Sequence, residues 1–346
     1  MINIPHIRLA SHQLSGTHHQ TPEEVVAWMG AVQAQDYHAA EMAISIRLPN
    51  SIDKNVENAF NQGKILRTHV LRPTWHFVTP ENIRWMLSLS AARIISSSLS
   101  RDRELEITEA LYSQTNRIIQ KSLEGGRHLT REAVGKELEK HKIIVNSARL
   151  VHFLMRTEVE GIVCSGALQG KDRTYALLDE RAPAVPPLHK EEALAKLAQL
   201  YFQSHCPATL QDFAWWSGLS PTEARQGLES LKSGWITEKI DSQIYWIRED
   251  YQNISHTGNF CCLLPAFDEY IIAYKDRSPV LLSEHHNKAV SSNGVFRAVI
   301  IANGQVVGLW KKSSQKKNSL LFEFFEPVND ELKERIKEKA KILFYE

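Results

Sequence analysis

The chain has 346 residues, of which 43% are hydrophobic and 23% are charged. This near-average composition excludes a collagen, a coiled coil and a wholly disordered chain, and the length predicts more than one domain. The 41 basic and 40 acidic residues leave a net charge of +1. A nucleic-acid binder of this composition would therefore need a local basic patch to contact phosphates.

No segment is typical of a membrane span or a secretory signal. Apolar runs such as 261–267 are far shorter than the about 20 residues that a membrane-spanning helix needs. The N-terminus lacks a basic segment followed by an apolar stretch. The four cysteines form no zinc-binding spacing and favour free thiols in a reducing compartment. We therefore expect a cytoplasmic protein without a membrane partner.

Several helix starts are clear in the sequence. The motif at 21–24, Thr-Pro-Glu-Glu, predicts a capping box and a helix through Met29. The motif at 79–81, Thr-Pro-Glu, predicts a second helix through about Leu89, and the motif at 220–223, Ser-Pro-Thr-Glu, predicts a third.

Two segments have the same expected order of elements: a helix, a turn, a second helix and a two-stranded hairpin. The expected helices are 130–138 and 147–160 in the first segment and 209–216 and 220–231 in the second, with hairpins over 162–178 and 235–247. Any small α+β module gives this pattern, but its occurrence twice favours tandem winged helices.

Strands dominate the pattern after about residue 255. Asn303-Gly304 between two apolar runs predicts a type I′ hairpin, and Asn329 is expected to cap a last helix over 330–343. We therefore predict an α+β fold with tandem winged-helix (helix-turn-helix plus β-hairpin) domains, followed by a small β-rich, barrel-like C-terminal domain. The expected domains are an N-terminal winged-helix-like domain, a second winged helix, a third winged helix and the β-rich domain with its terminal helix, over 1–125, 126–183, 188–254 and 255–346.

Motifs for nucleotide cofactors and for the common hydrolases are absent from the sequence, which has no G-x-G-x-x-G, P-loop, H-E-x-x-H or G-x-S-x-G. Glu284-His285-His286 could ligate a metal, but adjacent histidines project in different directions and no third ligand is evident. This favours an exposed loop, so we expect neither a metal nor a cofactor.

Two glutamines, Gln33 and Gln35, lie two residues apart among apolar residues after the first helix. On a continued helix their side chains would point about 200° apart, whereas in an extended segment they share one face. Their convergence therefore requires the helix to end near Gln33. The spacing alone favours a plainer interpretation, in which both amides are satisfied by the backbone.

Residues 67–77 mix basic, hydroxyl and aromatic side chains in a stretch of strand character. They fit an ordinary strand with exposed polar side chains. They also fit a face on which Arg67 and Arg72 contact phosphates and Trp75 or His76 contacts a base.

Over nearly its whole length the chain resembles the AlkZ-type winged-helix DNA glycosylases, which unhook alkylated bases and interstrand crosslinks. Gln33-Ala34-Gln35 matches the family's glutamine–aliphatic–glutamine motif. A sister group has aspartate in place of the second glutamine. Pro73 replaces the family's glycine and Trp75 its apolar residue, and proline removes an N–H and fixes φ beside the pocket. The segments that carry the resemblance are 31–36, 67–78, 154–165, 175–183, 209–218, 264–278 and 294–310.

The resemblance implies a monofunctional DNA glycosylase that hydrolyses the N-glycosidic bond of cationic alkylated purines and extends to interstrand crosslinks. Gln35 is assigned to positioning the water and Gln33 to orienting the water or the sugar, and the two roles are interchangeable. A neutral amide is not a strong base, so it suits a leaving group that is already cationic. The candidate residues of the lesion pocket are Asp36, which is equally a candidate helix cap, and Arg67, Thr68, Arg72, Trp75 and His76.

The expected partner is lesion-containing double-stranded DNA, bound by a monomer that would then be associated with the bacterial nucleoid. The glycine-flanked loop 166–173 suits a wing that contacts the backbone or minor groove, and equally a flexible hairpin tip. Asp268 and Glu269 are interpreted as parts of a structural turn rather than as a catalytic acid pair. The expected DNA contacts are Gln169, Lys171, Arg173, Lys275 and Arg277.

The main alternative is a non-enzymatic winged-helix DNA-binding protein or transcriptional regulator, and a third interpretation is a protein-interaction scaffold. A regulator reads bases with an exposed helix. Helix 220–231 has few basic residues and carries the acidic Glu223 and Glu229, so it is poorly suited to reading bases. Salt-dependent DNA binding would separate the scaffold from both DNA-binding alternatives.

Overall fold

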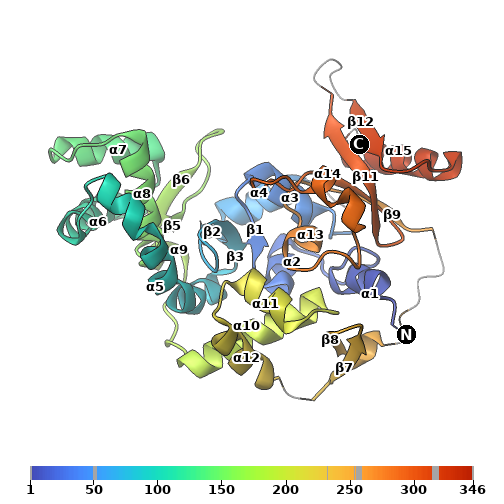
Figure 1. Ribbon diagram of the computed structural model, residues 1–346. Coiled ribbons are helices and arrows are strands. Elements are labelled where there is room, and N and C mark those ends of the chain that lie inside the picture. Colours follow the sequence, from blue (N-terminus) through green and yellow to red (C-terminus); the bar gives the residue numbers. More distant parts are fainter. Residues whose placement is uncertain are drawn as a thin grey trace. The chain divides into compact units, whose positions relative to one another are not determined.

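The structure is a computed structural model and describes residues 2–49, 53–231, 233–252, 254, 259–313 and 319–344. It mixes helices and sheets, as predicted (Figure 1). The chain divides into two compact units, of which unit 1 comprises Met1–Asp53 and Ala195–Glu346 and unit 2 comprises Lys54–Leu194. Within the described ranges, every helix is too short or too polar to cross a membrane.

Unit 2 packs three helices against a small antiparallel sheet of order β4-β6-β5. Its core consists of apolar side chains from α6, α7, α8, β5 and β6. The elements of unit 2 are α4 (Asp53–Asn61), whose first residue belongs to unit 1, β2 (Leu66–His69), β3 (Trp75–Val78), α5 (Pro80–Glu104), α6 (Glu109–Leu123), β4 (Leu129–Thr130), α7 (Arg131–Lys140), α8 (Ser147–Val159), β5 (Val163–Ser165), β6 (Thr174–Leu177) and α9 (Leu178–Arg181).

Unit 1 combines both ends of the chain. Its N-terminal elements are α1 (Ile4–Ser11), α2 (Pro22–Met29), β1 (Val32–Gln33) and α3 (Tyr37–Ser45). Its later elements are α10 (Lys190–His205), which begins in unit 2, α11 (Leu210–Ser217), α12 (Pro221–Glu229), β7 (Trp235–Ile240), β8 (Gln243–Arg248), η1 (Glu249–Tyr251), β9 (Cys261–Leu264), α13 (Glu269–Ile272), η2 (Ser283–His285), α14 (His286–Ala289), β10 (Val299–Ala302), β11 (Gln305–Lys312), β12 (Leu320–Phe324) and α15 (Asp330–Phe344).

All three predicted helix starts are confirmed, those at Thr21 and Ser220 by capping boxes, whereas α5 begins at Pro80 with no side-chain cap hydrogen bond from Thr79. The Thr21 hydroxyl accepts the N–H of Glu24, whose carboxylate accepts the N–H of Thr21, and the same reciprocal pair begins α12. The predicted end of α5 near Leu89 is wrong, because this helix continues to Glu104. No glycine or proline follows Leu89 within that stretch, so no local signal stops the helix there.

Both expected helix–hairpin segments contain their elements in the expected order. In unit 2, α7 and α8 precede the antiparallel strands β5 and β6. In unit 1, α11 and α12 precede the antiparallel hairpin of β7 and β8. Gly218 ends α11 with a left-handed φ of 68°, as a helix C-terminus commonly requires.

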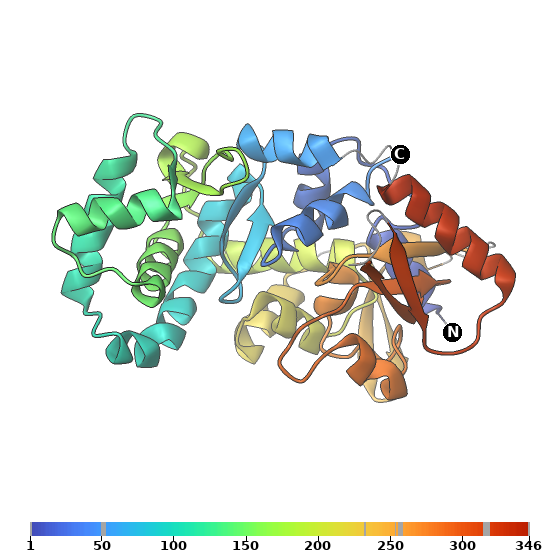
Figure 2. The same ribbon diagram turned by 90° about the horizontal axis from the view of Figure 1, so that it is seen from above.

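The C-terminal strands form an open sheet, which corrects the expected barrel-like domain. Their order is β12-β11-β10-β9, and no sheet in the described part of the chain closes into a barrel. Side chains of the strands alternate between two buried clusters, with Leu263, Ile300 and Trp310 on the face of α15 and Leu264, Val299 and Leu309 on the other. Figures 1 and 2 show α15 beside these strands. Because helix α15 covers one face and four strands are too few to enclose a core, the sheet stays open.

The predicted hairpin at Asn303-Gly304 is confirmed. Asn303 has a φ of 47° and Gly304 a φ of 82°, the two positive values that a type I′ turn requires. A Cβ at Gly304 would lie 2.6 Å from the Cβ of Pro5, so glycine is needed here for close packing as well as for conformation.

Candidate active site

The segment that carries Gln33 and Gln35 joins α2 to α3 in unit 1. Helix α2 ends at Met29, and Gly30 follows with a φ of 76°. The chain is then extended in β1, which contains Gln33. The helix therefore ends before Gln33, as convergence of the two amides requires.

The two glutamines have different surroundings. Gln33 is 4% exposed, whereas Gln35 is exposed. Gln33 Oε1 accepts the backbone N–H of Gln35 over 3.4 Å, and an amide oxygen has a second lone pair that can accept a hydrogen bond from water. Asp36 acts as the N-cap of α3, since its carboxylate accepts the N–H of Ala39 over 3.1 Å.

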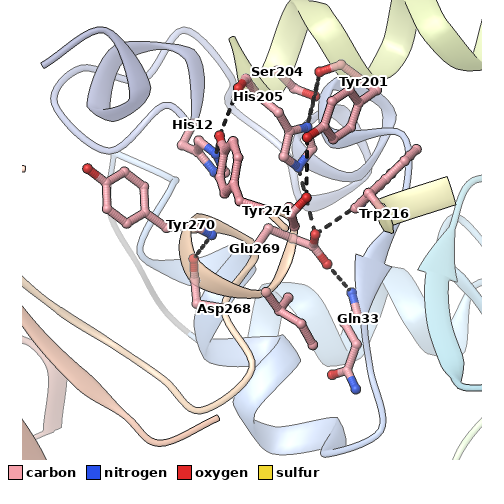
Figure 3. Close-up of polar contacts among 12 residues, drawn as sticks. His12, Gln33, Tyr201, Ser204, His205, Trp216, Asp268, Glu269, Tyr270 and Tyr274 are labelled. Carbon is pink, nitrogen blue, oxygen red and sulfur yellow. Dashed lines mark hydrogen bonds and ion pairs between the residues drawn. The ribbon is translucent and has the colours of Figure 1, made fainter. Parts of the chain in front are cut away.

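Glu269 connects the Gln33 segment to helices α10 and α11. It lies in the first turn of α13, and its Oε1 accepts the N–H of Gln33 over 2.7 Å. Its Oε2 accepts the indole N–H of Trp216 over 3.1 Å and lies 3.7 Å from Nε2 of His205 (Figure 3). Gln33 and Glu269 are 236 positions apart, so the sequence showed Glu269 only as part of a turn.

Two histidines lie behind Glu269 in a fully buried aromatic cluster. Tyr274 donates its hydroxyl proton to the carbonyl of His205 over 2.8 Å, so His12 Nε2 must donate to Tyr274 Oη over 2.7 Å. Tyr201 stacks on the His205 ring at a centroid distance of 4.7 Å. Burial lowers the pKa of His12 well below its ordinary value and also lowers the pKa of His205. Both rings are therefore neutral at pH 7.

The buried histidines predict that the protein loses stability in mild acid. In the unfolded chain a histidine has a pKa of about 6.5 and binds a proton as the pH falls, whereas folded His12 does not. Neutral His12 therefore contributes fully to the free energy of unfolding above about pH 6.5, and this contribution is lost as the pH falls below that value. Urea unfolding at pH 7.5 and pH 5.5 should show a lower free energy of unfolding at the lower pH, with a loss of roughly 1 kcal/mol from His12 and a smaller loss from His205.

A pair of histidine variants checks the origin of this pH effect. His12→Gln should show a smaller fall in the free energy of unfolding between the two pH values than the wild type. His141→Gln, at the exposed end of α7, should keep the wild-type fall. An equal fall in His12→Gln and the wild type would contradict the assignment to His12.

Asp268, the N-cap of α13, holds the turn that carries Glu269. Its two carboxylate oxygens accept hydrogen bonds from Nη1 and Nη2 of Arg47, each over 2.8 Å. Arg47 also donates to the carbonyls of His12 and Ala43 over 2.9 and 2.6 Å. The guanidinium therefore joins α13 to the N-terminal helices of unit 1, and the interpretation of Asp268 as a structural residue fits these contacts.

In unit 2, the hairpin of β2 and β3 gathers part of the second predicted cluster. The Arg67 guanidinium lies 4.3 Å from the ring centre of Trp75, within cation–π range. The rings of His69 and Trp75 are 4.2 Å apart. Glu158 accepts the Trp75 indole N–H over 3.3 Å and contacts His69 Nδ1, so it orients both rings. The sequence did not single out His69 or Glu158, which is 83 positions from Trp75.

The remaining members of that cluster lie elsewhere on the hairpin. Thr68 pairs with His76 in the register, and both side chains are fully buried, on the opposite face from Arg67 and Trp75 because neighbouring residues alternate across a strand. Arg72 lies half-buried in the connection between β2 and β3. Unit 2 therefore brings together Arg67 and Trp75, and separates them from Thr68 and His76.

Comparison with known proteins decides the family. The model of the family described as DNA glycosylase AlkZ-like matches residues 26–343, which is most of the chain. The chain belongs to the AlkZ-like DNA glycosylase family. This confirms the predicted family and enzyme class, and DNA is the substrate that the class implies.

Relatives from one organism agree with this family. A curated protein of Streptomyces sahachiroi, named interstrand DNA cross-link repair glycosylase, is 23% identical over 310 residues, which cover 85% of this chain and 82% of the relative. The solved structure of Streptomyces sahachiroi DNA glycosylase AlkZ matches with a TM-score of 0.83 and 20% identity, covering 99% of this chain and 95% of that one. At this identity the structural match shows a shared fold.

The loop of this AlkZ-like glycosylase between β5 and β6 places three predicted DNA contacts at a hairpin tip. Gln169 and Asp172 exchange backbone hydrogen bonds of 2.9 and 3.1 Å around Gly170, whose φ is 63°. Gln169, Lys171 and Arg173 are exposed. Leu168 donates its N–H to Asn61 Oδ1 over 2.8 Å, so the base of the loop is held to α4 within unit 2.

The other two predicted contacts follow α13 in unit 1. Lys275 is exposed, and its Nζ lies 5.1 Å from the ring centre of Trp215. Arg277 is half-buried, and its Nε donates to the carbonyl of Ile271 over 2.9 Å. This contact gives Arg277 a structural role in the turn, whereas Lys275 presents its charge to solvent.

One group in the described ranges has the residue types of a metal site. Donor atoms of Glu284, His285 and Glu326 lie within 4.8 Å of one another. His285 Nε2 is 3.6 Å from a carboxylate oxygen of each glutamate. Glu326 was not foreseen as a third ligand, because it lies on a different part of the chain. Both carboxylates are exposed, at about 70% of their side-chain surface, and exposed acidic groups commonly lie near one another without a metal.

Proposed function

We propose that this AlkZ-like glycosylase hydrolyses the N-glycosidic bond of cationic alkylated purines in duplex DNA, with Gln33 and Gln35 positioning the attacking water. The observation that carries the proposal is the end of α2 before the motif: the chain is extended at Val32–Gln33 and bends at Gln35, and Glu269 holds the Gln33 backbone. Because the segment is not helical, the two amides are free of the opposite orientations that a continued helix would impose on them.

The chemistry of an amide limits the substrate. The transition state of glycosidic hydrolysis carries positive charge on the sugar, which an amide oxygen stabilises without ionising. An amide supplies no strong base and no acid for the leaving group. N7- or N3-alkylated purines need no acid, because the leaving base is already cationic. Asp36, the nearby carboxylate, is engaged as a helix cap, which favours the glutamines.

Release of free base from a duplex that carries N7-methylguanine tests this proposal. A nitrogen-mustard crosslink, assayed in parallel for separation of the two strands, tests whether the substrate range extends to interstrand crosslinks. The name of the Streptomyces sahachiroi relative, an interstrand DNA cross-link repair glycosylase, motivates this second substrate. Base release with both substrates is the expected result, and release with neither would contradict the proposal.

We propose further that residues 126–183 and 188–254 are winged helices that grip the duplex, following an N-terminal domain over 1–125 and preceding the sheet domain of 255–346. The order of helices and hairpins in both segments supports this division.

We propose that the protein acts as a monomer on nucleoid DNA in the cytoplasm. Its four free thiols, three of them buried, are consistent with this location, because free thiols suit a reducing compartment.

The basic loop tip predicts a measurable change in salt dependence. Lys171→Ala with Arg173→Ala should reduce the slope of log affinity against log salt by about 1.8, because each phosphate that a basic side chain neutralises contributes about 0.9 to this slope. Fluorescence anisotropy with duplex DNA at several salt concentrations measures the slope. The control Lys333→Ala with Lys337→Ala removes the same charge from α15 and should leave the slope unchanged. Equal slopes in both variants would contradict a DNA contact by the loop.

A further inference from the structure

Glu269 is a carboxylate placed deep in unit 1, where an ionised group is costly unless its oxygens are hydrogen-bonded. It is 1% exposed. Its two oxygens each accept an N–H from a different part of unit 1, Gln33 of β1 at 2.7 Å and Trp216 of α11 at 3.1 Å. Figure 3 shows the carboxylate between these donors. The carboxylate therefore links the glutamine motif directly to the helical core.

We propose that Glu269 is a positioning residue of the glycosylase reaction, which fixes the Gln33 backbone so that the two glutamine amides face one water. This proposal rests on the proposed function, in which Gln33 acts on the water. Gln33 Oε1 also accepts the Gln35 N–H. A shift of the Gln33 backbone would therefore misplace both amides, and displacements of about 1 Å can lower a catalysed rate by about 100-fold.

The groups around Glu269 make it a rigid support. Trp216 is fully buried in α11. His205 Nδ1 lies 2.8 Å from Ser204 Oγ and 3.2 Å from the carbonyl of Tyr201, so the imidazole beside Glu269 is held in one orientation. These residues belong to α10 and α11, the two helices that supply the neighbours of the Glu269 carboxylate. Support from locked neighbours is what a precisely placed catalytic group requires.

Direct catalysis by Glu269 is disfavoured by its contacts. A general base must reach the water, within about 3 Å or through one further water. Both Glu269 oxygens are engaged by protein N–H groups, and the side chain is buried. The chemistry is therefore left to the amides of Gln33 and Gln35, and Glu269 acts through the backbone of Gln33.

A double-mutant cycle tests the proposal through its coupling to Gln33. Glu269→Gln keeps the size of the side chain but turns an amide N–H₂ toward one of the two N–H donors. Single-turnover release of 7-methylguanine from duplex DNA is measured for the wild type, Glu269→Gln, Gln33→Ala and the double variant. We expect Glu269→Gln to lower the rate by about 10–100-fold, with affinity for the lesion duplex within about threefold of wild type. Glu269→Gln should cost a smaller factor in the Gln33→Ala background than in the wild type, because only the placement of Gln35 is then left to lose.

The other outcomes of the cycle overturn either the positioning role of Glu269 or the proposed function, and they differ in which one they overturn. A wild-type rate for Glu269→Gln, or effects of the two changes that multiply, would overturn the positioning role while leaving the glutamines as catalytic groups. A wild-type rate for Gln33→Ala would overturn the proposed function, and the positioning role would fall with it.

Controls separate positioning from a loss of folding. Asp102 in unit 2 is a matched buried carboxylate, 3% exposed, which accepts the Tyr112 hydroxyl over 2.7 Å. Asp102→Asn should lower the melting temperature and leave the rate of base release unchanged. Trp216→Phe removes only the second donor to Glu269 and should lower the rate less than Glu269→Gln. If Glu269→Gln does not fold, Trp216→Phe takes its place in the cycle, and its effect on the rate should likewise be smaller in the Gln33→Ala background than in the wild type.

Discussion

Gln33→Ala combined with Gln35→Ala is expected to lower single-turnover release of 7-methylguanine by about 100-fold or more, since removing one preorganised polar group at a transition state commonly costs about 100–1,000-fold. Without the two amides, water loses its orientation and the sugar cation loses a nearby partial negative charge. A cationic purine also leaves DNA spontaneously at a slow rate. Base release by the double variant should therefore fall toward this spontaneous background.

Binding and folding should survive this double substitution. Gln33 is held by its backbone N–H, which alanine retains, and Gln35 is exposed. Affinity for the lesion duplex should stay within a few-fold of wild type. The control Gln114→Ala with Gln120→Ala changes two exposed glutamines on α6 and should keep the wild-type rate. Equal rates for both double variants would exclude the glutamine pair from catalysis.

Arg47→Met is expected to have the largest effect on stability, about 3–5 kcal/mol in the free energy of unfolding, as for other buried ion pairs that lose one partner. Arg47 and Asp268 have side chains 2% and 0% exposed. Removal of the guanidinium leaves a buried carboxylate and the carbonyls of His12 and Ala43 without their donor. Urea unfolding followed by circular dichroism measures the loss.

A surface pair provides the matched control for Arg47→Met. Arg101 and Glu104 are ion-paired with side chains 58% exposed, and exposed pairs contribute about 0–1 kcal/mol. Arg101→Met should therefore change the free energy of unfolding by less than about 1 kcal/mol. An Arg47→Met variant that unfolds at the wild-type urea concentration would contradict the structural role of the Arg47–Asp268 pair.

Local sequence signals predicted local structure well in this chain. The capping boxes at Thr21 and Ser220 and the turn at Asn303-Gly304 depend only on neighbouring residues. The end of α5 was missed because no breaker residue marks it. The open C-terminal sheet was missed because the packing of α15 over its strands depends on contacts between distant segments, which local patterns do not contain.

The candidate site shows the same limit. The glutamine motif was found through a family resemblance, since its spacing alone favoured two amides satisfied by the backbone. The structure contains one such contact, between Gln33 Oε1 and the Gln35 N–H. The hydrogen-bond partners of these residues, Glu269 for Gln33 in unit 1 and Glu158 for Trp75 in unit 2, are distant in sequence and have no motif of their own.

A comparison of two lesions shows most directly whether two neutral amides carry the catalysis in this enzyme. Wild-type protein is incubated in excess with duplexes that carry either N7-methylguanine or uracil, and the released base is quantified. The amide mechanism predicts release of 7-methylguanine far above the spontaneous rate and no release of uracil, whose departure needs stronger catalysis. Efficient release of uracil, or release of neither base despite intact duplex binding, would contradict it.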